Sequence, residues 1–141
     1  MALIRYREGV NRWTGEPLIG WPDCRQSMAE IITTLEEERV MLLDFSGDVL
    51  RWIGRNTVAP IVTKLYRSAF TSIRRWEPEF RPAQVQLLYV DALGGLALGM
   101  RGRYFPEGRY GNYALSVPKG AAFAVRDAEL LGQSADLAEA A

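Results

Sequence analysis

The stretch Arg74-Arg75-Trp76-Glu77-Pro78-Glu79-Phe80-Arg81-Pro82 joins charges of both signs, a tryptophan and two prolines, and we call it the corner. A proline restricts the residue before it to extended conformations, and the corner contains two such pairs, Glu77-Pro78 and Arg81-Pro82. A helix that arrives from the N-terminal side must therefore end here, and the chain must leave as an extended segment. Two interpretations remain open: a helix end followed by a strand, and a surface that holds a partner in a fixed orientation.

The residues before the corner predict a long helix. Apolar side chains recur at helical spacing in one stripe of Ile61, Leu65, Ala69 and Ile73 and in a second stripe of Val62, Tyr66 and Phe70. We expect Thr57 to cap this helix and Pro60 to lie in its first turn.

The residues after the corner predict an antiparallel meander. Val85, Leu87 and Tyr89 alternate with Gln84, Gln86 and Leu88, as in a half-buried strand. A turn at residues 91–95 leads to a second strand over residues 96–103, and we expect a third at Tyr113 to Val117. Beyond Gly120 the composition shifts to Ala, Asp and Glu without an apolar stripe.

The first 55 residues predict a second helix and several short elements. Residues 11–18 have the turn chemistry of a loop or irregular hairpin, and Asp23 and Gln26 have the spacing of a capping box for a helix over residues 24–35. The acidic run 36–38 is expected to form a solvated turn. A metal-binding acidic cluster is the less favoured alternative, because consecutive carboxylates do not converge on one point. Val40 to Leu43 is expected to form a short buried strand, and Val49 to Ile53 a helical turn.

These elements predict an α+β fold with two main helices packed on a mostly antiparallel sheet. Residues 1–120 are expected to form a single domain, and residues 121–141 a C-terminal tail that is weakly helical or flexible. The length of 141 residues and the 48% content of hydrophobic residues suit one sizeable core.

Charge and composition limit the classes of molecule that this protein is expected to bind. Seventeen basic and seventeen acidic residues cancel, which argues against nucleic-acid binding and against binding to acidic lipids. Fifteen of the basic residues are Arg, which favours protein interfaces, although a GC-rich genome is an equal explanation. Apolar runs fall short of the ~18 residues of a membrane span, no signal peptide is evident, and Cys24 is the single cysteine. We expect a soluble protein made in a reducing compartment.

The residues of most catalytic sites are missing, so we expect no enzymatic activity and no cofactor. The chain has no histidine, and its two lysines lie in no serine-lysine motif. Phage-type lysozymes pair a Glu with an Asp at a fixed sequence spacing, and no Glu here is followed by an Asp nine positions later.

The ordered segments resemble the baseplate assembly protein W family of contractile phage tails, which is related to the wedge component of type VI secretion baseplates. The resemblance covers roughly residues 9 to 112 and is carried by Asn11 to Leu18, Gln26-Ser27 with Ile31 to Thr34, Arg39 to Met41 with Phe45 to Gly47, Arg75 to Pro78, and Tyr104 to Gly108. It implies a fold that resembles the strand-exchange domain of tail sheath proteins. It also implies a virion baseplate protein, assembled in the host cytoplasm, that is present in multiple copies in a ring and binds other wedge proteins and the tail sheath protein.

The family's corner reads Glu-Pro-Arg, whereas Glu77-Pro78 is followed here by Glu79. Either Arg81 supplies the guanidinium from a neighbouring position, or the partner surface has changed sign. We hypothesise an electrostatic latch at Glu77 together with strand exchange at residues 84–117. The predicted partner-binding residues are Arg75, Trp76, Glu77, Pro78, Glu79, Arg81, Tyr104 and Pro106. Trp76, Tyr104 and Pro106 have core packing as an equal explanation. The rival functions are a cytoplasmic regulator of the same fold that binds a proteolysis adaptor, and a peptidoglycan hydrolase.

Overall fold

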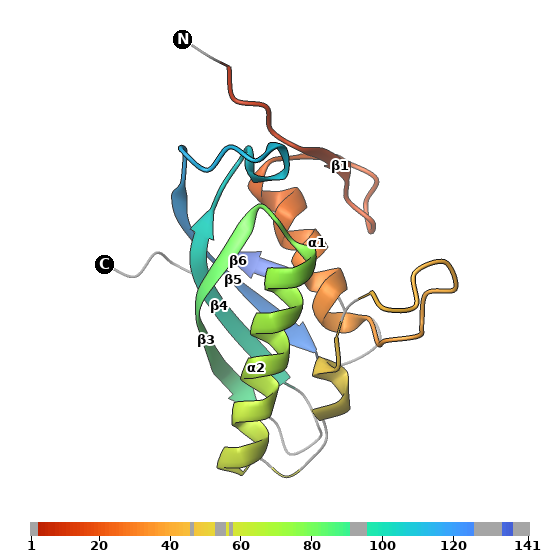
Figure 1. The fold of residues 1–141 in the computed structure, drawn as a ribbon. Helices are drawn as coiled ribbons and strands as arrows, with labels where there is room; N and C mark the ends of the chain where they lie inside the picture. Colours follow the sequence, from red (N-terminus) through yellow and green to blue (C-terminus); the bar gives the residue numbers. More distant parts are fainter. Residues whose placement is uncertain are drawn as a thin grey trace.

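The computed structural model describes residues 3–45, 47–52, 56, 58–90, 96–125 and 134–136. Two helices pack on an antiparallel sheet, as predicted, and a small two-stranded hairpin precedes them (Figure 1). The elements in chain order are β1 (Glu8–Val10), β2 (Pro17–Ile19), α1 (Trp21–Thr33), the 3-10 helix η1 (Val49–Trp52), α2 (Ala59–Trp76), β3 (Phe80–Val90), β4 (Leu96–Tyr104), the 3-10 helix η2 (Gly108–Tyr110), β5 (Val117–Val125) and β6 (Ser134–Asp136).

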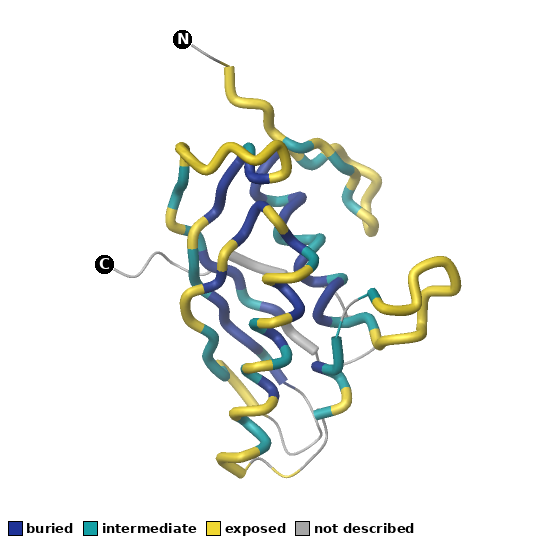
Figure 2. The backbone as a smooth tube through the Cα atoms, in the orientation of Figure 1, coloured by how far each residue is buried: buried dark blue, intermediate teal, exposed yellow. Residues whose placement is uncertain are grey.

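The core lies between the helices and one face of the sheet. The strands follow the order β3-β4-β5-β6, with α2 against β3 and α1 against β5 and β6. Figure 2 shows that both helices and the central strands contain buried segments where the two layers face each other. Fully buried side chains from both layers include Met28, Ile32, Ile73, Leu98, Met100 and Phe123.

The helix α2 confirms the prediction from the apolar stripe. Its buried face contains Leu65, Ala69 and Ile73, and Pro60 lies in its first turn. The helix begins after Val58, which provides no side-chain cap, and Thr57 lies outside the described residues. At the other end the backbone N–H of Glu77 donates to the carbonyl of Ile73 at 2.9 Å, and Glu77 itself is extended. The corner therefore ends the helix where the two prolines require it to end.

The meander after the corner is confirmed for its first two strands. β3 pairs with β4 from Phe80↔Tyr104 to Val90↔Leu96, and the predicted turn at residues 91–95 lies outside the described residues. Bulges interrupt β3 between Pro82 and Gln84 and between Leu87 and Tyr89. A bulge increases local twist and ends regular pairing, so the regular central segment of β3 is short.

The predicted third strand is misplaced. Residues 113–116 form a loop that is exposed at residues 113–115, and the strand that pairs with β4 is β5, which extends to Val125. Residues 121–125 and 134–136 lie in the segment predicted to be a helical or flexible tail, and they form strands instead. Small residues such as Ala121 have low intrinsic preference for strands, and here pairing with β4 and burial against the core override that preference.

The first helix begins three residues earlier than predicted. Gly20 precedes it with a positive φ of 73°, and Pro22 occupies the first turn, where a missing N–H costs nothing. Asp23 is inside this turn rather than at the cap, because its carboxylate accepts a hydrogen bond from Arg7. The capping-box interpretation of Asp23 is therefore wrong.

The prediction of a short buried strand at Val40 to Leu43 is also wrong. These four residues lie in an exposed loop between α1 and η1, in which local turns satisfy part of the backbone. Residues 36–38 are an exposed turn, as predicted, and η1 confirms the helical turn after residue 49. No helix in the described part of the chain has the length and apolar character needed to cross a bilayer.

Candidate interaction site at the corner

The corner carboxylates converge on an arginine from the N-terminal segment. Arg7 directly precedes β1, and its Nη1 donates to Glu77 Oε1 at 2.9 Å and Oε2 at 3.0 Å. Its Nε donates to Asp23 Oδ2 at 2.6 Å, and Nη1 lies 3.5 Å from Glu79 Oε2. One planar guanidinium thus bridges the end of α2, the start of α1 and the start of β3.

A second arginine completes this group, which we call the corner cluster: Arg7, Asp23, Glu77, Glu79 and Arg109. Arg109 Nε lies 3.2 Å from Glu79 Oε1 and forms an ion pair with it, although Oε1 makes no hydrogen bond to any described residue. Glu77 is 2% exposed and Glu79 is fully buried. Three carboxylates and two guanidinium groups leave a net charge of −1 at a partly desolvated position.

Burial and charge shift the ionisation of this cluster. Burial raises the pKa of Glu79 above its ordinary value, and the charges of Arg7 and Arg109 oppose that rise. Burial works against the charge on Arg7, but Glu77 and the other nearby anions raise the pKa of Arg7 overall. Burial and the charge of Glu79 also raise the pKa of Tyr104, whose hydroxyl has no hydrogen-bond partner among the described residues. Arg7 and Arg109 therefore favour the charged form of Glu79 against the effect of its burial.

The cations that face Glu79 do not include Arg81. The guanidinium of Arg81 lies over the ring of Tyr113, at 4.3 Å from the ring centroid, and near Phe105. Arg7 and Arg109 take that place within the same chain. No sequence pattern pointed to either arginine, since Arg7 is 70 residues from Glu77 in the chain.

The predicted partner-binding residues separate into an exposed and a buried group. Arg75, Pro78 and Arg81 are exposed, and Arg75 pairs with Asp44 at 3.0 Å. Trp76 is half-buried and packs on Phe45, with 5.2 Å between ring centroids. The buried group consists of Glu77, Glu79, Tyr104 and Pro106. Partner contact through the Glu77 side chain stays a prediction, and it now requires the segment that carries Arg7 to move.

At the corner cluster, three of the described residues carry atoms of the kind that can bind a metal ion. One ligand atom each from Cys24, Glu77 and Glu79 lies within 4.8 Å of the others. The Arg7 guanidinium already forms ion pairs with both carboxylates, and burial raises the pKa of the Cys24 thiol, which disfavours the thiolate that a metal needs. This arrangement favours an internal ion-pair cluster over a metal centre.

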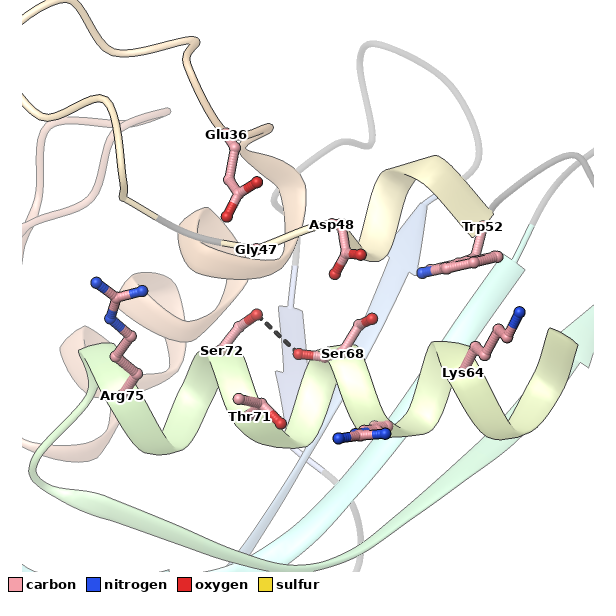
Figure 3. Close-up of a pocket in the computed structure, with 10 residues that line it drawn as sticks. Glu36, Gly47, Asp48, Trp52, Lys64, Ser68, Thr71, Ser72 and Arg75 are labelled. Carbon is pink, nitrogen blue, oxygen red and sulfur yellow. Dashed lines mark hydrogen bonds between the residues drawn. The ribbon is translucent and has the colours of Figure 1, made fainter. Parts of the chain in front are cut away.

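A second candidate is a cleft of about 440 Å³ between α2, η1 and the segment around Gly47 (Figure 3). Ser68 and Ser72 lie on the α2 side, and Lys64 Nζ lies 5.0 Å from the centroid of the Trp52 ring. Asp48 lines the opposite wall. Hydroxyl groups and charges of both signs suit a polar protein segment better than a single anionic ligand.

Solved structures of other proteins have the same fold as this chain, although its sequence matches no protein family. No protein-family model matches the sequence, and no curated protein matches it. Among solved structures, one chain of the pyocin R2 baseplate in its postcontracted state matches with a TM-score of 0.58 and 24% identity. The match covers 70% of this chain and 98% of that chain. This protein shares its fold with a baseplate chain.

A second solved structure has the same fold. It is a protein of Geobacter sulfurreducens described as a candidate tail lysozyme, with a TM-score of 0.55 and 19% identity. The match covers 76% of this chain and 92% of that chain. At these identities the two likenesses establish the fold, and a function for this chain has to be argued from its own surfaces.

Proposed function

We propose that this protein is a structural subunit of the baseplate wedge in a contractile, phage-like tail. The observation that carries the proposal is the fold shared with the pyocin R2 baseplate chain, 98% of which is covered. The protein then occurs in several copies around a ring and binds other wedge proteins and the tail sheath protein. It is made and assembled in the host cytoplasm, and it performs no catalytic step.

The strand β3 supports docking of the sheath by strand addition. β3 pairs with β4 on one side and lies at an edge of the four-stranded sheet on the other. Leu87 donates its backbone N–H to the hydroxyl of Tyr66 at 2.7 Å, so this N–H points away from β4. Alternate residues of a strand face the same edge, and Val85 therefore presents its N–H there as well.

The bulges of β3 confine this edge to a short segment. Pairing with β4 is regular from Gln84 to Leu87, and register shifts lie on both sides. A sheath arm can add main-chain hydrogen bonds at this segment, while the bulges discourage unspecific pairing along the rest of the edge.

Location in the particle tests the proposal first. The gene would be deleted from its producer, complemented with a tagged copy, and the tails purified and analysed by mass spectrometry and electron microscopy. We expect the tagged chain in the baseplate and no sheathed tails without it. A chain that stays free in the cytoplasm while normal tails assemble would overturn the proposal and favour the regulator that binds a proteolysis adaptor.

A single substitution tests strand addition. Val85→Pro removes the outward N–H without removing a hydrogen bond to β4, and Val85→Thr is the matched control that retains the N–H. We expect Val85→Pro to enter baseplates that lack sheath, and Val85→Thr to give sheathed tails. Normal sheath attachment with Val85→Pro would refute this route of docking.

Peptidoglycan hydrolysis is the second candidate function. It is favoured by the description of the Geobacter protein and by two carboxylates, Glu36 and Asp48, that line the cleft beside α2. Glu36 lies 3.7 Å from Arg51 and the chain has no histidine. We expect no clearing of a peptidoglycan suspension in a turbidity assay. Clearing that disappears with Glu36→Gln or Asp48→Asn would establish the enzyme instead.

A further inference from the structure

A loop with an apolar tip projects from the molecule between α1 and η1 (Figure 1). All residues from 35 to 44 are exposed. Val40 is 85% exposed, Met41 is 96% exposed and Leu43 is 57% exposed. Single exposed apolar side chains are ordinary, but a contiguous run of four large ones marks an interaction surface.

The loop is held in one conformation by its own contacts. Backbone hydrogen bonds run from Glu37 N–H to the carbonyl of Leu43 at 2.8 Å and from Leu42 N–H to the carbonyl of Arg39 at 3.2 Å. The carboxylate of Glu38 accepts the N–H of Leu35 at 2.9 Å. Glu37 adopts a positive φ of 70°, an uncommon conformation for a residue other than glycine. The tip is thus presented at little further cost in conformational entropy.

Side-chain contacts anchor the base of the loop to the body. The Arg39 guanidinium lies 4.1 Å from the centroid of the Phe45 ring and 3.4 Å from the carboxylate of Glu30 in α1. Asp44 pairs with Arg75 in α2. The two sides of the tip therefore contact α1 and α2, respectively.

Charge around the tip identifies the kind of partner. Residues 36–44 contain four acidic side chains and one basic side chain, a net charge of −3. Glu36 and Asp44 have arginine partners, but neither Glu37 nor Glu38 has a cation within ion-pair distance among the described residues. The surface beside the apolar tip is therefore acidic.

We propose that Val40 to Leu43 insert into an apolar groove, rimmed by Lys or Arg, on a different protein of the same baseplate. This inference rests on the proposed function for the class of partner. An anionic membrane surface would repel the acidic rim.

Cross-linking in assembled particles tests the contact directly. p-Benzoylphenylalanine would replace Met41 in the full-length chain, and tails purified after irradiation would be analysed by mass spectrometry. We expect one cross-link to a different baseplate protein, on an apolar surface with basic residues nearby. A cross-link to a second copy or to lipid would overturn the inference. If the chain is present in the baseplate but forms no cross-link, the inference is also overturned, and the proposed function is not affected. A chain absent from the particles would overturn the proposed function itself.

Binding to the purified cross-linked protein then measures the contribution of the tip. Met41→Asp is expected to weaken the affinity about tenfold or more, because a methionine loses its burial and a charge enters the groove. Leu3→Asp is the matched control, since Leu3 is 92% exposed and lies on another segment, and we expect its affinity to stay within about twofold of wild type. Replacing Glu37 and Glu38 by Lys is expected to weaken binding most at low salt. Equal affinity of Met41→Asp and Leu3→Asp would refute the inference, provided that both variants melt at the wild-type temperature.

Discussion

Removing the Arg7 guanidinium is expected to destabilise the fold more than any exposed charge substitution. Arg7→Met keeps the length of the side chain and leaves Glu77, which is 2% exposed, without its cation. Glu79 keeps only its contact with Arg109. Breaking a buried pair by removing one partner costs about 3–5 kcal/mol, a large part of the roughly 5–15 kcal/mol that holds a typical domain together.

The loss is expected to depend on pH in a defined direction. Burial already raises the pKa of Glu79 in the folded state, so the folded protein holds this proton more tightly than the unfolded chain does. A group of this kind favours folding most at low pH, and that contribution disappears as the pH rises through its folded-state pKa. Without Arg7 the pKa of Glu79 rises further. The deficit of Arg7→Met is therefore largest near about pH 8 and shrinks toward about pH 5.

Urea unfolding followed by tryptophan fluorescence measures both effects, because Trp21 lies in the core near the corner cluster. Arg12→Ala is the control: Arg12 pairs with Glu30 at 3.3 Å with 44% of its side chain exposed, and its loss should cost less than about 1 kcal/mol. A loss below about 1 kcal/mol for Arg7→Met, or a deficit that does not change with pH, would refute the assignment of the cluster as a buried stabilising network.

Three further substitutions test the sheet. Gly102→Ala would push a methyl group into the carbonyl of Arg81 beside the first bulge, and we expect a lower melting temperature and a loss of about 1–3 kcal/mol in urea unfolding. Tyr66→Phe removes the acceptor of the Leu87 N–H, with an expected cost of about 1 kcal/mol and faster hydrogen exchange at that amide. Ala121→Asp places a charge at a fully buried position of β5, and we expect insoluble or unfolded protein; a soluble, cooperatively folding variant would contradict the placement of this strand in the core.

The local rules of the backbone predicted the elements around the corner. Prolines at 78 and 82 ended α2 and started an extended strand, and the stripe Leu65, Ala69 and Ile73 gave the buried face of that helix. These signals act over a few residues, so they survive in any tertiary context. Where the local signal was weak or ambiguous, the predictions failed. The run Val40 to Leu43 has the composition of a strand, but it pairs with no strand among the described residues and forms a loop. The Ala-rich segment 121–125 has poor strand propensity, but it pairs with β4 and forms a strand.

The candidate site was predictable only in part. The sequence singled out Glu77 and Glu79 as unusual, and the structure places both in one cluster. Their counter-ions Arg7 and Arg109 come from segments far away in the chain, and no spacing rule connects them to the corner. Arg81 is two residues from Glu79 and was the nearest candidate in the sequence. In β3, however, Phe80 is buried and the next residue, Arg81, is exposed, with its guanidinium over the rings of Phe105 and Tyr113.

By itself the sequence determined the class of the fold, the end of α2 at the corner, the start of the meander and the absence of histidine chemistry, because each depends on residue identity or on contacts within a few residues. Only the tertiary structure decided that the two carboxylates of the corner, Glu77 and Glu79, face inward, that the last strands join the sheet, and that an apolar loop faces outward. Those outcomes depend on which distant segments meet and on how much water they exclude, and both are properties of the packed chain.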